Sequence, residues 1–425
     1  MELKKYKLGE ILDVTRGASL SGEFYAAEGE YVRLTCGNFD YQNNCFKENK
    51  AKDNLYYIGD FKPDFLMKEG DIITPLTEQA IGLLGSTAII PESGKYIQSQ
   101  DVAKIVCKEH LLDKDFAFYL ISSNLVKQQL SAAAQQTKIR HTSPDKIKDC
   151  IVWIPELEEQ KRIGKLLRTI DLKIELNRQL NHNLEAMAKQ LYDYWFVQFD
   201  FPDENGKPYK SSGGKMVWDK RLKREIPLLW KAKIVEEVAD VYNGATPSTV
   251  NELNYGGDIV WITPKDLSDQ KQKFVYQGER NISQVGYDSC STHLLPSNTI
   301  LMSSRAPIGL LAIAKTELCT NQGFKSFVSK SKNIATYLYY YLQYHITQIE
   351  QLGTGTTFKE VSREDILKFP MLKPSDNVLD LWEEIVSALN DRQLEIQKEN
   401  ENLIKQRDEL LPLLMNGQVS VNYDL

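Results

Sequence analysis

The sequence has no long apolar run, no closely spaced cysteines and no excess of positive charge. No apolar stretch approaches the roughly 20 residues that would span a bilayer, and the amino terminus, MELKKYKLGEILDV, lacks the apolar core of a signal peptide. The six cysteines are scattered, which argues against a zinc site or a disulfide framework. We therefore expect a cytoplasmic protein with reduced thiols, no bound metal and no membrane partner.

Histidine is also scarce, and the formal net charge is −6. The five histidines show neither metal-ligand spacing nor the spacing of a catalytic triad. The acidic balance does not suggest a nucleic-acid binder, although it allows one whose positive charge is confined to one face. With 425 residues, 42% hydrophobic and 26% charged, the composition indicates a globular protein of two or more domains.

What the sequence does contain is an internal repeat. LGEILDVTRGAS near the amino terminus matches VEEVADVYNGAT at 235–246, which places Asp13 on Asp240 and Gly17 on Gly244. Five further pairs follow in the same order: YVRLT with IVWIT, GDIIT with SNTILM, IGLLG with IGLLA, SQDVAKIV with NQGFKSFV, and SPDKIKDCIVWIP with SREDILKFPMLKP. Each match is weak alone, but six in one order predict two copies of one module.

Each copy combines short β-branched segments with one helical stretch. The segments are broken by Gly, Pro, Asn or Ser, as in a mostly β module. The stretches 113–130 and 333–352 have apolar residues at steps of three and four, which predicts a helix in each copy. We therefore expect each module to be β-rich and of the α+β class.

A long helix is predicted after each copy. Apolar positions from Ile163 to Trp195 alternate steps of four and three, and the same phase returns 219 residues later from Trp382 to Leu414, as in a coiled coil. The predicted helix-packing residues are Ile163, Leu167, Ile170, Ile174, Asn181, Leu184, Leu191, Val386, Leu389, Ile396, Asn400, Leu403, Leu410 and Leu414. The fold expected is α+β, with two repeated modules separated by two long antiparallel coiled-coil helices and an approximate two-fold between the halves.

Asn181 and Asn400 occupy equivalent positions of this seam. A buried Asn costs stability and fixes helix register, because misaligned helices leave its amide unpaired. The alternative is that both side chains lie at the solvated edge of the seam. The sequence leaves both interpretations open.

The segment FDFPDENGKPYKSSGGKMVW at 199–218 resembles either a nuclease motif or a phosphate-binding loop. The G-x-x-x-x-G-K pattern fails, because Tyr209 stands at the first Gly and Met216 stands where Ser or Thr binds magnesium. Its Pro and Gly residues favour turns, and its aromatic residues predict an ordered connector. The expected domains are a first module at 1–155, a helix at 156–198, the connector at 199–228, a second module at 229–374 and a helix at 375–421.

Two modules held apart by a rigid helix pair suit a long ligand with two separated features, such as duplex DNA. Hydroxyl and basic residues in the loops before each long helix are suited to phosphates, and Arg, Lys, Asn and Gln near strand ends to base edges. For any single loop residue a solvated turn is an equal alternative. The candidate DNA-binding residues are Arg16, Arg33, Gln79, Lys138, Arg140, His141, Thr142, Asn243, Lys265, Arg305, Lys325, Thr354, Thr356, Thr357, Lys359 and Arg363.

The doubled module, the two heptad helices, IPLLW at 226–230, SSRAPIGLLAIA and the terminal ENENLIKQRDELLPLLMNGQVSV together resemble the specificity subunit of type I restriction-modification systems. The resemblance covers essentially the whole chain. It implies two target recognition domains, each of which reads one half of a bipartite DNA sequence. It also implies helical regions that set the gap between the halves and dock two modification subunits, with restriction subunits as further partners.

In that family, methyl transfer from S-adenosylmethionine and the ATP- and magnesium-dependent restriction activity belong to the partner chains. The sequence supports this division, because it has neither an Asn-Pro-Pro-Tyr-like motif for adenine nor a Gly-rich strand-turn-helix for S-adenosylmethionine. We therefore expect no catalytic residue and no cofactor in this chain. The alternative interpretation is a non-catalytic scaffold whose modules and coiled coil bind only proteins.

Overall fold

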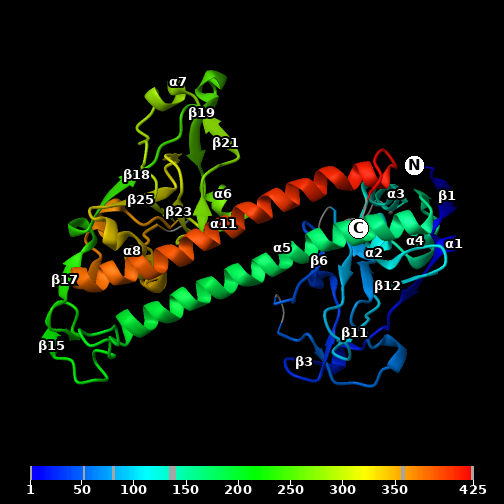
Figure 1. Cartoon of the computed structure of the whole chain (residues 1–425), viewed down its shortest axis with the longest axis horizontal. Helices are drawn as coiled ribbons and strands as arrows, with labels where there is room; N and C mark the ends of the chain where they lie inside the picture. Colours follow the sequence, from blue (N-terminus) through cyan, green and yellow to red (C-terminus); the bar gives the residue numbers. More distant parts are fainter. Residues whose placement is uncertain (1, 51–52, 79–81, 134–139, 356–358, 423–425) are drawn as a thin grey trace. The chain divides into compact units, whose positions relative to one another are not determined.

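The computed structural model describes residues 2–50, 53–78, 82–133, 140–355 and 359–422. The chain divides into two compact units, one formed by Met1–Leu176 with Asn400–Leu425 and the other by Asn177–Glu399 (Figure 1). Each unit contains one β-rich module and a part of each long helix.

The first module is built around a four-stranded sheet of order β10-β8-β12-β2. These strands are Ala88–Ile89, Ile72–Pro75, Val102–Cys107 and Leu12–Arg16, and each pairs antiparallel with its neighbour. A second sheet of order β11-β4-β7-β3 joins Tyr96–Ile97, Tyr31–Arg33, Tyr56–Tyr57 and Tyr25–Ala26. The alternation of β-branched and polar residues in short runs is what a half-buried strand requires.

Shorter elements complete the first module. Two short antiparallel pairs join β1 (Lys4–Lys7) with β14 (Ile151–Ile154) and β5 (Phe39–Asp40) with β6 (Cys45–Phe46). The helices are α1 (Leu8–Ile11), α2 (Lys114–Ile121), α3 (Asn124–Ala133) and α4 (Pro144–Lys148). The Asp113 side chain accepts a hydrogen bond from the Phe116 backbone N–H and caps α2 at the point where the helix was expected to begin.

The second module repeats this arrangement. Its main sheet has the order β18-β25-β22-β23-β20, with strands Ala239–Asn243, Phe324–Ser329, Ile300–Ser303, Leu311–Ala314 and Phe274–Val275. A smaller sheet of order β21-β19-β24 joins Arg280–Ile282, Tyr255–Ile262 and Cys319–Thr320, and β17 (Lys231–Ile234) pairs with β26 (Pro370–Lys373). The helices are α6 (Pro264–Gln270), α7 (Gln284–Asp288), α8 (Ala335–Tyr344), α9 (Ile346–Gln351) and α10 (Arg363–Leu367).

Equivalent backbone contacts confirm that the two modules are structural repeats. Ala18 N donates to Gln98 O at 2.9 Å, and Ala245 N donates to Thr320 O at 3.0 Å. A Cβ on the preceding residue, Gly17 or Gly244, would lie 2.2 Å from a backbone carbonyl oxygen. Only glycine permits this close approach, which explains why the repeat retains a glycine at this position.

The two long helices are α5 (Leu157–Tyr192), which ends in a π turn at Asp193–Val197, and α11 (Asp376–Met415). In the first unit Asp171 of α5 contacts Arg407 of α11, and in the second unit Asn177 contacts Glu399 and Asn181 contacts Gln393. Residue numbers therefore rise along α5 as they fall along α11. The helices are antiparallel, as expected from the sequence.

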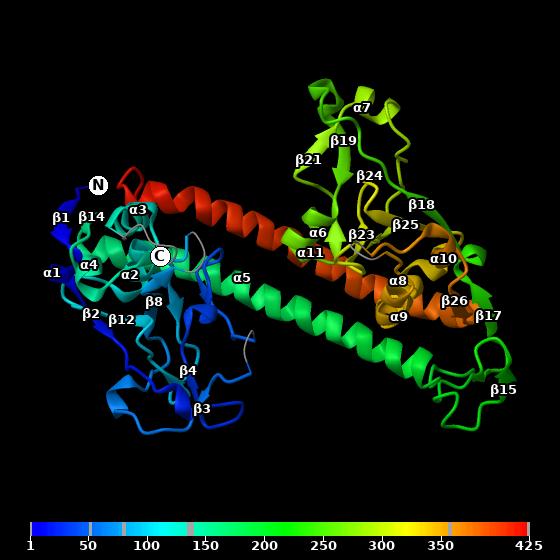
Figure 2. The same ribbon diagram turned by 180° about the vertical axis from the view of Figure 1, so that it is seen from behind.

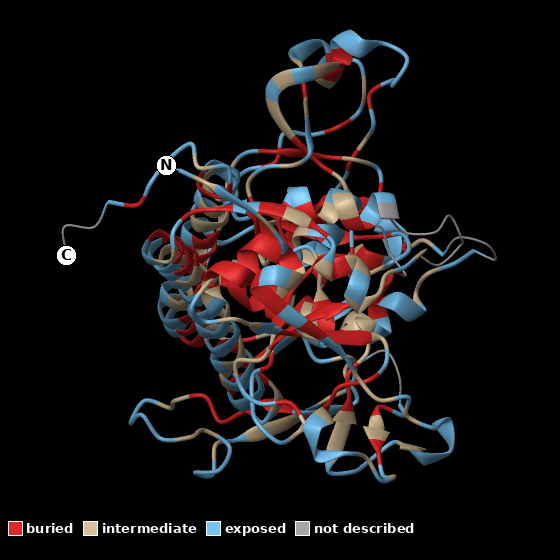
Figure 3. Cartoon of the chain, turned by 90° about the vertical axis from the view of Figure 1, so that its right-hand side faces the viewer, coloured by how far each residue is buried: buried red, intermediate tan, exposed pale blue. Residues whose placement is uncertain are grey.

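The predicted seam residues are all buried or half-buried. Figure 3 colours the chain by burial, with buried residues in red and intermediate ones in tan. The buried positions are Ile163, Leu167, Ile174, Val386, Ile396, Asn400 and Leu414, and the half-buried ones are Ile170, Asn181, Leu184, Leu191, Leu389, Leu403 and Leu410. Asn181 bonds across the seam in both directions, because its Nδ2 donates to Gln393 O and its backbone O accepts from Gln393 Nε2. This geometry fits the register interpretation better than the solvated-edge alternative.

The core of the second unit is dominated by aromatic side chains. Figures 1 and 2 both show α8 beside α11, and the rings of Tyr340 and Trp382 lie 5.7 Å apart. The connector joins this core, because Phe201 stacks on Trp230 at 4.9 Å. Its hairpin pairs β15 (Met216–Asp219) with β16 (Arg224–Pro227). The connector therefore packs against the aromatic core of the second unit.

Candidate nucleic-acid interface

One edge of each main sheet gathers some of the predicted contact residues. Strands β2 and β8 both run antiparallel to β12, so their carboxyl ends lie at the same edge. Ala103 pairs with Arg16 on one side and Thr74 on the other. The equivalent row of the second module has Lys325 between Asn243 and Met302. Arg16 and Asn243 are both exposed at this edge.

In the second module, two loops meet around the carboxylate of Glu360. Arg305 Nε donates to Glu360 Oε2 at 3.0 Å, and Lys325 Nζ donates to Glu360 Oε1 at 3.3 Å and to Ser304 Oγ at 3.3 Å. Thr354 and Glu360 exchange backbone hydrogen bonds of 3.1 and 3.0 Å. Lys359 is exposed beside them. Two cations, Arg305 and Lys325, therefore share one carboxylate.

Lys325 and Arg305 differ in their access to a ligand. Lys325 is only 4% exposed, and burial lowers the pKa of its ammonium group while Glu360 opposes that shift. The side chain of Arg305 is about half exposed. Arg305 is thus the side chain that can turn its guanidinium toward a base or a phosphate, while Lys325 supports the loop from beneath.

In the first module, the corresponding edge joins β9 (Thr77–Glu78) to β13 (Arg140–His141). Arg140 Nη1 lies 3.6 Å from Glu78 Oε2 and donates to Ser131 Oγ at 2.9 Å. The His141 Nδ1 lies 3.4 Å from Thr77 Oγ1. Thr142 follows, and its hydroxyl oxygen is buried without a hydrogen-bond partner among the residues that the structure describes. Here too a partly exposed arginine lies beside a carboxylate, although without a direct hydrogen bond to it.

Several candidates lie elsewhere. Arg33 is only 8% exposed, its guanidinium donates to Asn54 O, and it stacks 3.9 Å over the Tyr25 ring. Its role in the structure is to pack the second sheet of the first module. Lys265 is exposed at the start of α6 and pairs with Glu279 at 2.8 Å. The Nε of Arg363 donates to Val241 O at 2.6 Å.

Four candidates lie outside the described residues, namely Gln79, Lys138, Thr356 and Thr357. Their described neighbours, Glu78, Arg140 and Thr354, are at the edge itself.

Sequence reasoning missed the two carboxylates, Glu78 and Glu360. Basic and hydroxyl residues were chosen because they suit phosphates, whereas each carboxylate acts by holding a cation that is distant in sequence. Glu360 meets Arg305 across 55 residues, and only the fold reveals that meeting. Nothing in the local sequence FKEVSRED, which also contains Glu364 and Asp365, singles out Glu360 as the partner of a distant cation.

An ion pair at this edge can be replaced by a contact with DNA at a small cost in free energy. The Arg305–Glu360 pair is partly exposed on both sides. Such a pair contributes only about 0 to 1 kcal/mol, so a phosphate or a base edge can replace this carboxylate beside Arg305 at small cost. Arginine suits guanine because its two parallel N–H groups match the O6 and N7 acceptors. Among the described residues, no group of three or more His, Cys, Asp or Glu side chains is placed to hold a metal. No helix in the described ranges is long and apolar enough to cross a bilayer.

Comparison with known proteins gives two matches to one family within this chain. The sequence model described as type I restriction modification DNA specificity domain matches residues 1–186 and 227–406. The type I restriction enzyme MjaIX specificity subunit of Methanocaldococcus jannaschii is 35% identical over 197 residues, and the match spans 45% of this chain and 46% of that protein. The HindI specificity subunit of Haemophilus influenzae is 24% identical over 467 residues, which cover 98% of this chain and 99% of that protein.

A solved structure extends the likeness to the fold. The S subunit of a type I restriction-modification system from M. genitalium covers 98% of this chain, and 96% of that chain is matched, with a TM-score of 0.65 at 16% identity. At this identity the likeness concerns the fold alone.

Proposed function

Since this chain belongs to the family of type I restriction modification DNA specificity domains, we propose that it is the subunit that recognises DNA for a methyltransferase and endonuclease complex. Each module contacts one half of a bipartite target through the edge of its main sheet. The observation that carries this proposal is the occurrence of two family matches in one chain, each over a module with a partly exposed arginine at the same edge.

The chemistry would then be divided between chains. This chain supplies binding and spacing, while methyl transfer from S-adenosylmethionine and ATP- and magnesium-dependent cleavage belong to partners. Those partners are two modification subunits docked on the helix pair and its flanks, together with restriction subunits. The acidic net charge agrees with this division, because partner chains would share the phosphate contacts.

Exchange of one module tests the assignment. Residues 1–155 are replaced with the first module of another family member, and methylation is mapped by sequencing after reconstitution with modification subunits. One half of the modified sequence should change while the other half and the spacer stay the same. The reciprocal exchange of residues 229–374 is the matched control. A change in both halves would show that the modules do not read independently, and methylation without sequence dependence would favour the scaffold alternative.

A paired insertion tests the role of the helices. Seven residues are inserted after Leu176 in α5 and seven after Glu399 in α11, where the chain passes from one unit to the other. The insertion adds two helical turns, about 10 Å, which corresponds to about three base pairs at 3.4 Å each. The spacer should lengthen with both half-sites unchanged. The same insertion in α5 alone is the control, because it preserves the seam pattern of one helix but shifts it against the other.

A further inference from the structure

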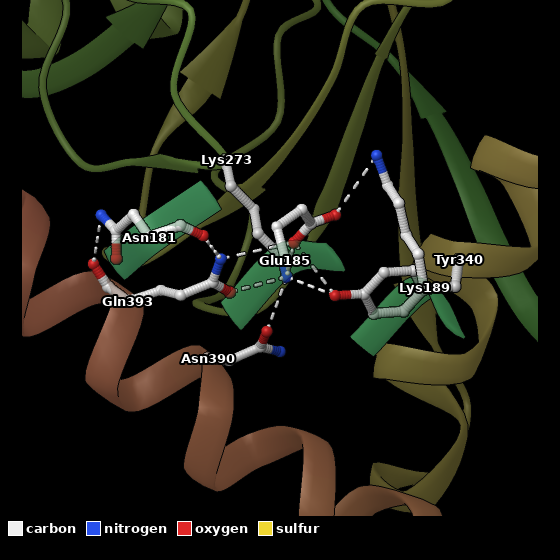
Figure 4. Close-up of polar contacts among 7 residues, drawn as sticks. All are labelled: Asn181, Glu185, Lys189, Lys273, Tyr340, Asn390 and Gln393. Carbon is white, nitrogen blue, oxygen red and sulfur yellow. Dashed lines mark hydrogen bonds and ion pairs between the residues drawn. The ribbon is translucent and has the colours of Figure 1, made fainter. Parts of the chain in front are cut away.

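A buried lysine of the second module reaches the seam between the two long helices. Lys273 immediately precedes the edge strand β20, and its side chain is only 10% exposed. Figure 4 shows its ammonium group among polar side chains from α5, α8 and α11. No sequence pattern marks this residue, since it stands in the polar stretch SDQKQKF.

Four oxygen atoms surround the ammonium group. Lys273 Nζ lies 2.8 Å from Glu185 Oε2 on α5, 2.6 Å from the Tyr340 hydroxyl on α8, 2.7 Å from Asn390 Oδ1 and 3.1 Å from Gln393 Oε1 on α11. An ammonium group has three N–H donors, so these acceptors satisfy it fully. One charge therefore joins the module to both helices at once.

The surrounding groups are tied to each other as well as to the lysine. The Tyr340 hydroxyl donates to Glu185 Oε2 at 3.2 Å, and Gln393 Nε2 donates to Asn181 O at 3.2 Å (Figure 4). One turn further along α11, Gln397 Nε2 donates to the backbone oxygen of Phe274 at 3.0 Å. The network thus includes the backbone of the module, the side chains of both helices and the seam asparagine.

Stability alone does not account for a charge at this place. Burial lowers the pKa of Lys273 to about 8, and the carboxylate of Glu185 only partly offsets that effect. The site therefore disfavours the charged form of the lysine compared with water. Buried ion pairs of this kind contribute little to stability, and their best-attested use is to fix register.

The apolar seam cannot fix this register by itself. A slip of seven residues returns apolar positions to apolar positions, because the pattern has a seven-residue repeat. The same slip of α5 would bring Arg178 or Tyr192 to the place of Glu185. Neither residue carries a negative charge at neutral pH, so the ammonium group would lose its counter-ion. Lys273 distinguishes registers that the hydrophobic pattern treats as equal.

We propose that Lys273 is a positioning residue that fixes the second module on the helix pair, sets the register of α5 against α11 and thereby determines the DNA spacer that the protein accepts. This proposal rests on the proposed function for its DNA part. Its register part concerns the protein alone.

The test for register uses disulfide trapping in the full-length chain. Asn177→Cys with Glu399→Cys reports the observed register, because these side chains are in contact at 2.8 Å. Asn177→Cys with Arg392→Cys reports a slip of seven residues. In a Lys273→Met background the second pair should cross-link, whereas with Lys273 present only the first should. Exclusive trapping of the first pair in both backgrounds would overturn the register part of the proposal.

The test for the spacer uses the complex reconstituted with modification subunits. Methylation rates are measured on DNA with fixed half-sites and spacers one to three base pairs shorter or longer. Lys273→Met should reduce the discrimination between the preferred spacer and its neighbours by about tenfold, while the half-site bases stay the same. Unchanged discrimination would overturn the spacer part. If methylation did not depend on the DNA sequence even with Lys273 present, the proposed function would be contradicted instead. The disulfide experiment would still test the helix register by itself.

Two further variants control these tests. Lys189→Met removes a neighbouring lysine that lies 3.8 Å from Glu185 but is about half exposed, and it should change neither readout. Glu185→Gln removes the counter-ion with little change of shape and should act like Lys273→Met, so a folding defect of one variant does not leave the question open. Lys273→Arg keeps the charge and should retain most of the spacer discrimination.

Discussion

In each unit a tyrosine, a carboxylate and a cation connect the module to the helices, but different elements supply the charged groups. In the first unit Tyr119 of α2 donates to Asp171 Oδ2 at 2.6 Å, and Arg407 of α11 donates to Asp171 Oδ1 at 2.8 Å. Both charges lie on the helices, and the module supplies only a hydroxyl group. In the second unit the module supplies the cation, Lys273, and α8 supplies the tyrosine.

Sequence position links the two arrangements. Asn390 stands 219 residues after Asp171, at the same phase of the repeated helix. The second copy therefore lacks the carboxylate of the first, and Glu185 on the opposite helix takes its role beside the cation. The repeat has kept a tyrosine, a carboxylate and a cation while changing which element carries each charge.

The cations also differ in their response to burial. Burial alone would lower the pKa of Arg407, but Asp171 and Asp408 outweigh it and raise the pKa. The pKa of Lys273 is instead lowered by its surroundings. The first arrangement favours its charge, whereas the second tolerates a charge at some cost.

The largest expected effect concerns the buried apolar residues of the seam in the two units. Trp382 and Ile163 occupy equivalent seam positions and are both fully buried, but Trp382 lies within an aromatic cluster in which Phe196 is 4.9 Å away. Trp382→Ala should destabilise the second unit by about 3 to 5 kcal/mol, and Ile163→Val should destabilise the first by about 1 kcal/mol.

Hydrogen exchange measures each unit separately. With Trp382→Ala, exchange should accelerate in the main sheet of the second module and much less in that of the first. Equal acceleration in both sheets would mean that the units unfold as one, and the comparison between them would lose its basis.

The second prediction concerns pH. Lysine in an unfolded chain titrates near about 10.4, so between about pH 8 and 10 the unfolded chain binds a proton that folded Lys273 has released. Stability should therefore rise with pH across this window, by about 2 to 3 kcal/mol relative to a Lys273→Met variant. The neighbouring groups Glu185, Lys189, Lys315 and Tyr340 are the same in both proteins.

Denaturant unfolding at several pH values between 7 and 10 measures this difference. The matched variant in the first unit is Arg407→Met, which should show no such slope because a guanidinium group stays charged throughout the window. If stability depended on pH equally in the Lys273→Met and Arg407→Met variants, Lys273 and Arg407 would not differ in the way proposed.

The smallest expected effect compares a surface arginine with a buried one. Arg305→Ala should weaken recognition of one half-site by about 1 to 3 kcal/mol and leave folding unchanged, because its side chain is about half exposed. Arg33→Ala should instead lower stability by about 1 to 2 kcal/mol through lost packing on Tyr25.

Binding or methylation assays on single-base variants of the target, together with thermal unfolding, separate these outcomes. A change in base preference after Arg33→Ala, with stability retained, would instead support a DNA contact by Arg33. An unchanged preference after Arg305→Ala would remove Arg305 from them.

The order and phase of the elements could be read from the chain. Gly17 and Gly244 marked equivalent turns, and the seam from Ile163 onward predicted both long helices, because periodicity and glycine requirements are local properties. The residues of the candidate site were harder to predict from the sequence. Arg33 is a residue type that often contacts DNA. In the fold, however, its guanidinium donates to the backbone oxygen of Asn54, 21 residues away, and the side chain is buried in the module.

The sequence by itself determined the repeat, the helix phase and the family, because these depend on spacing along one chain. Only the tertiary structure decided that Glu360 holds Arg305, that Asp171 faces Arg407 and that Lys273 enters the seam beside Glu185. Such pairs join residues 55 to 236 positions apart. A charge is neutralised by whatever the fold brings within about 3 Å, and no local pattern records that distance.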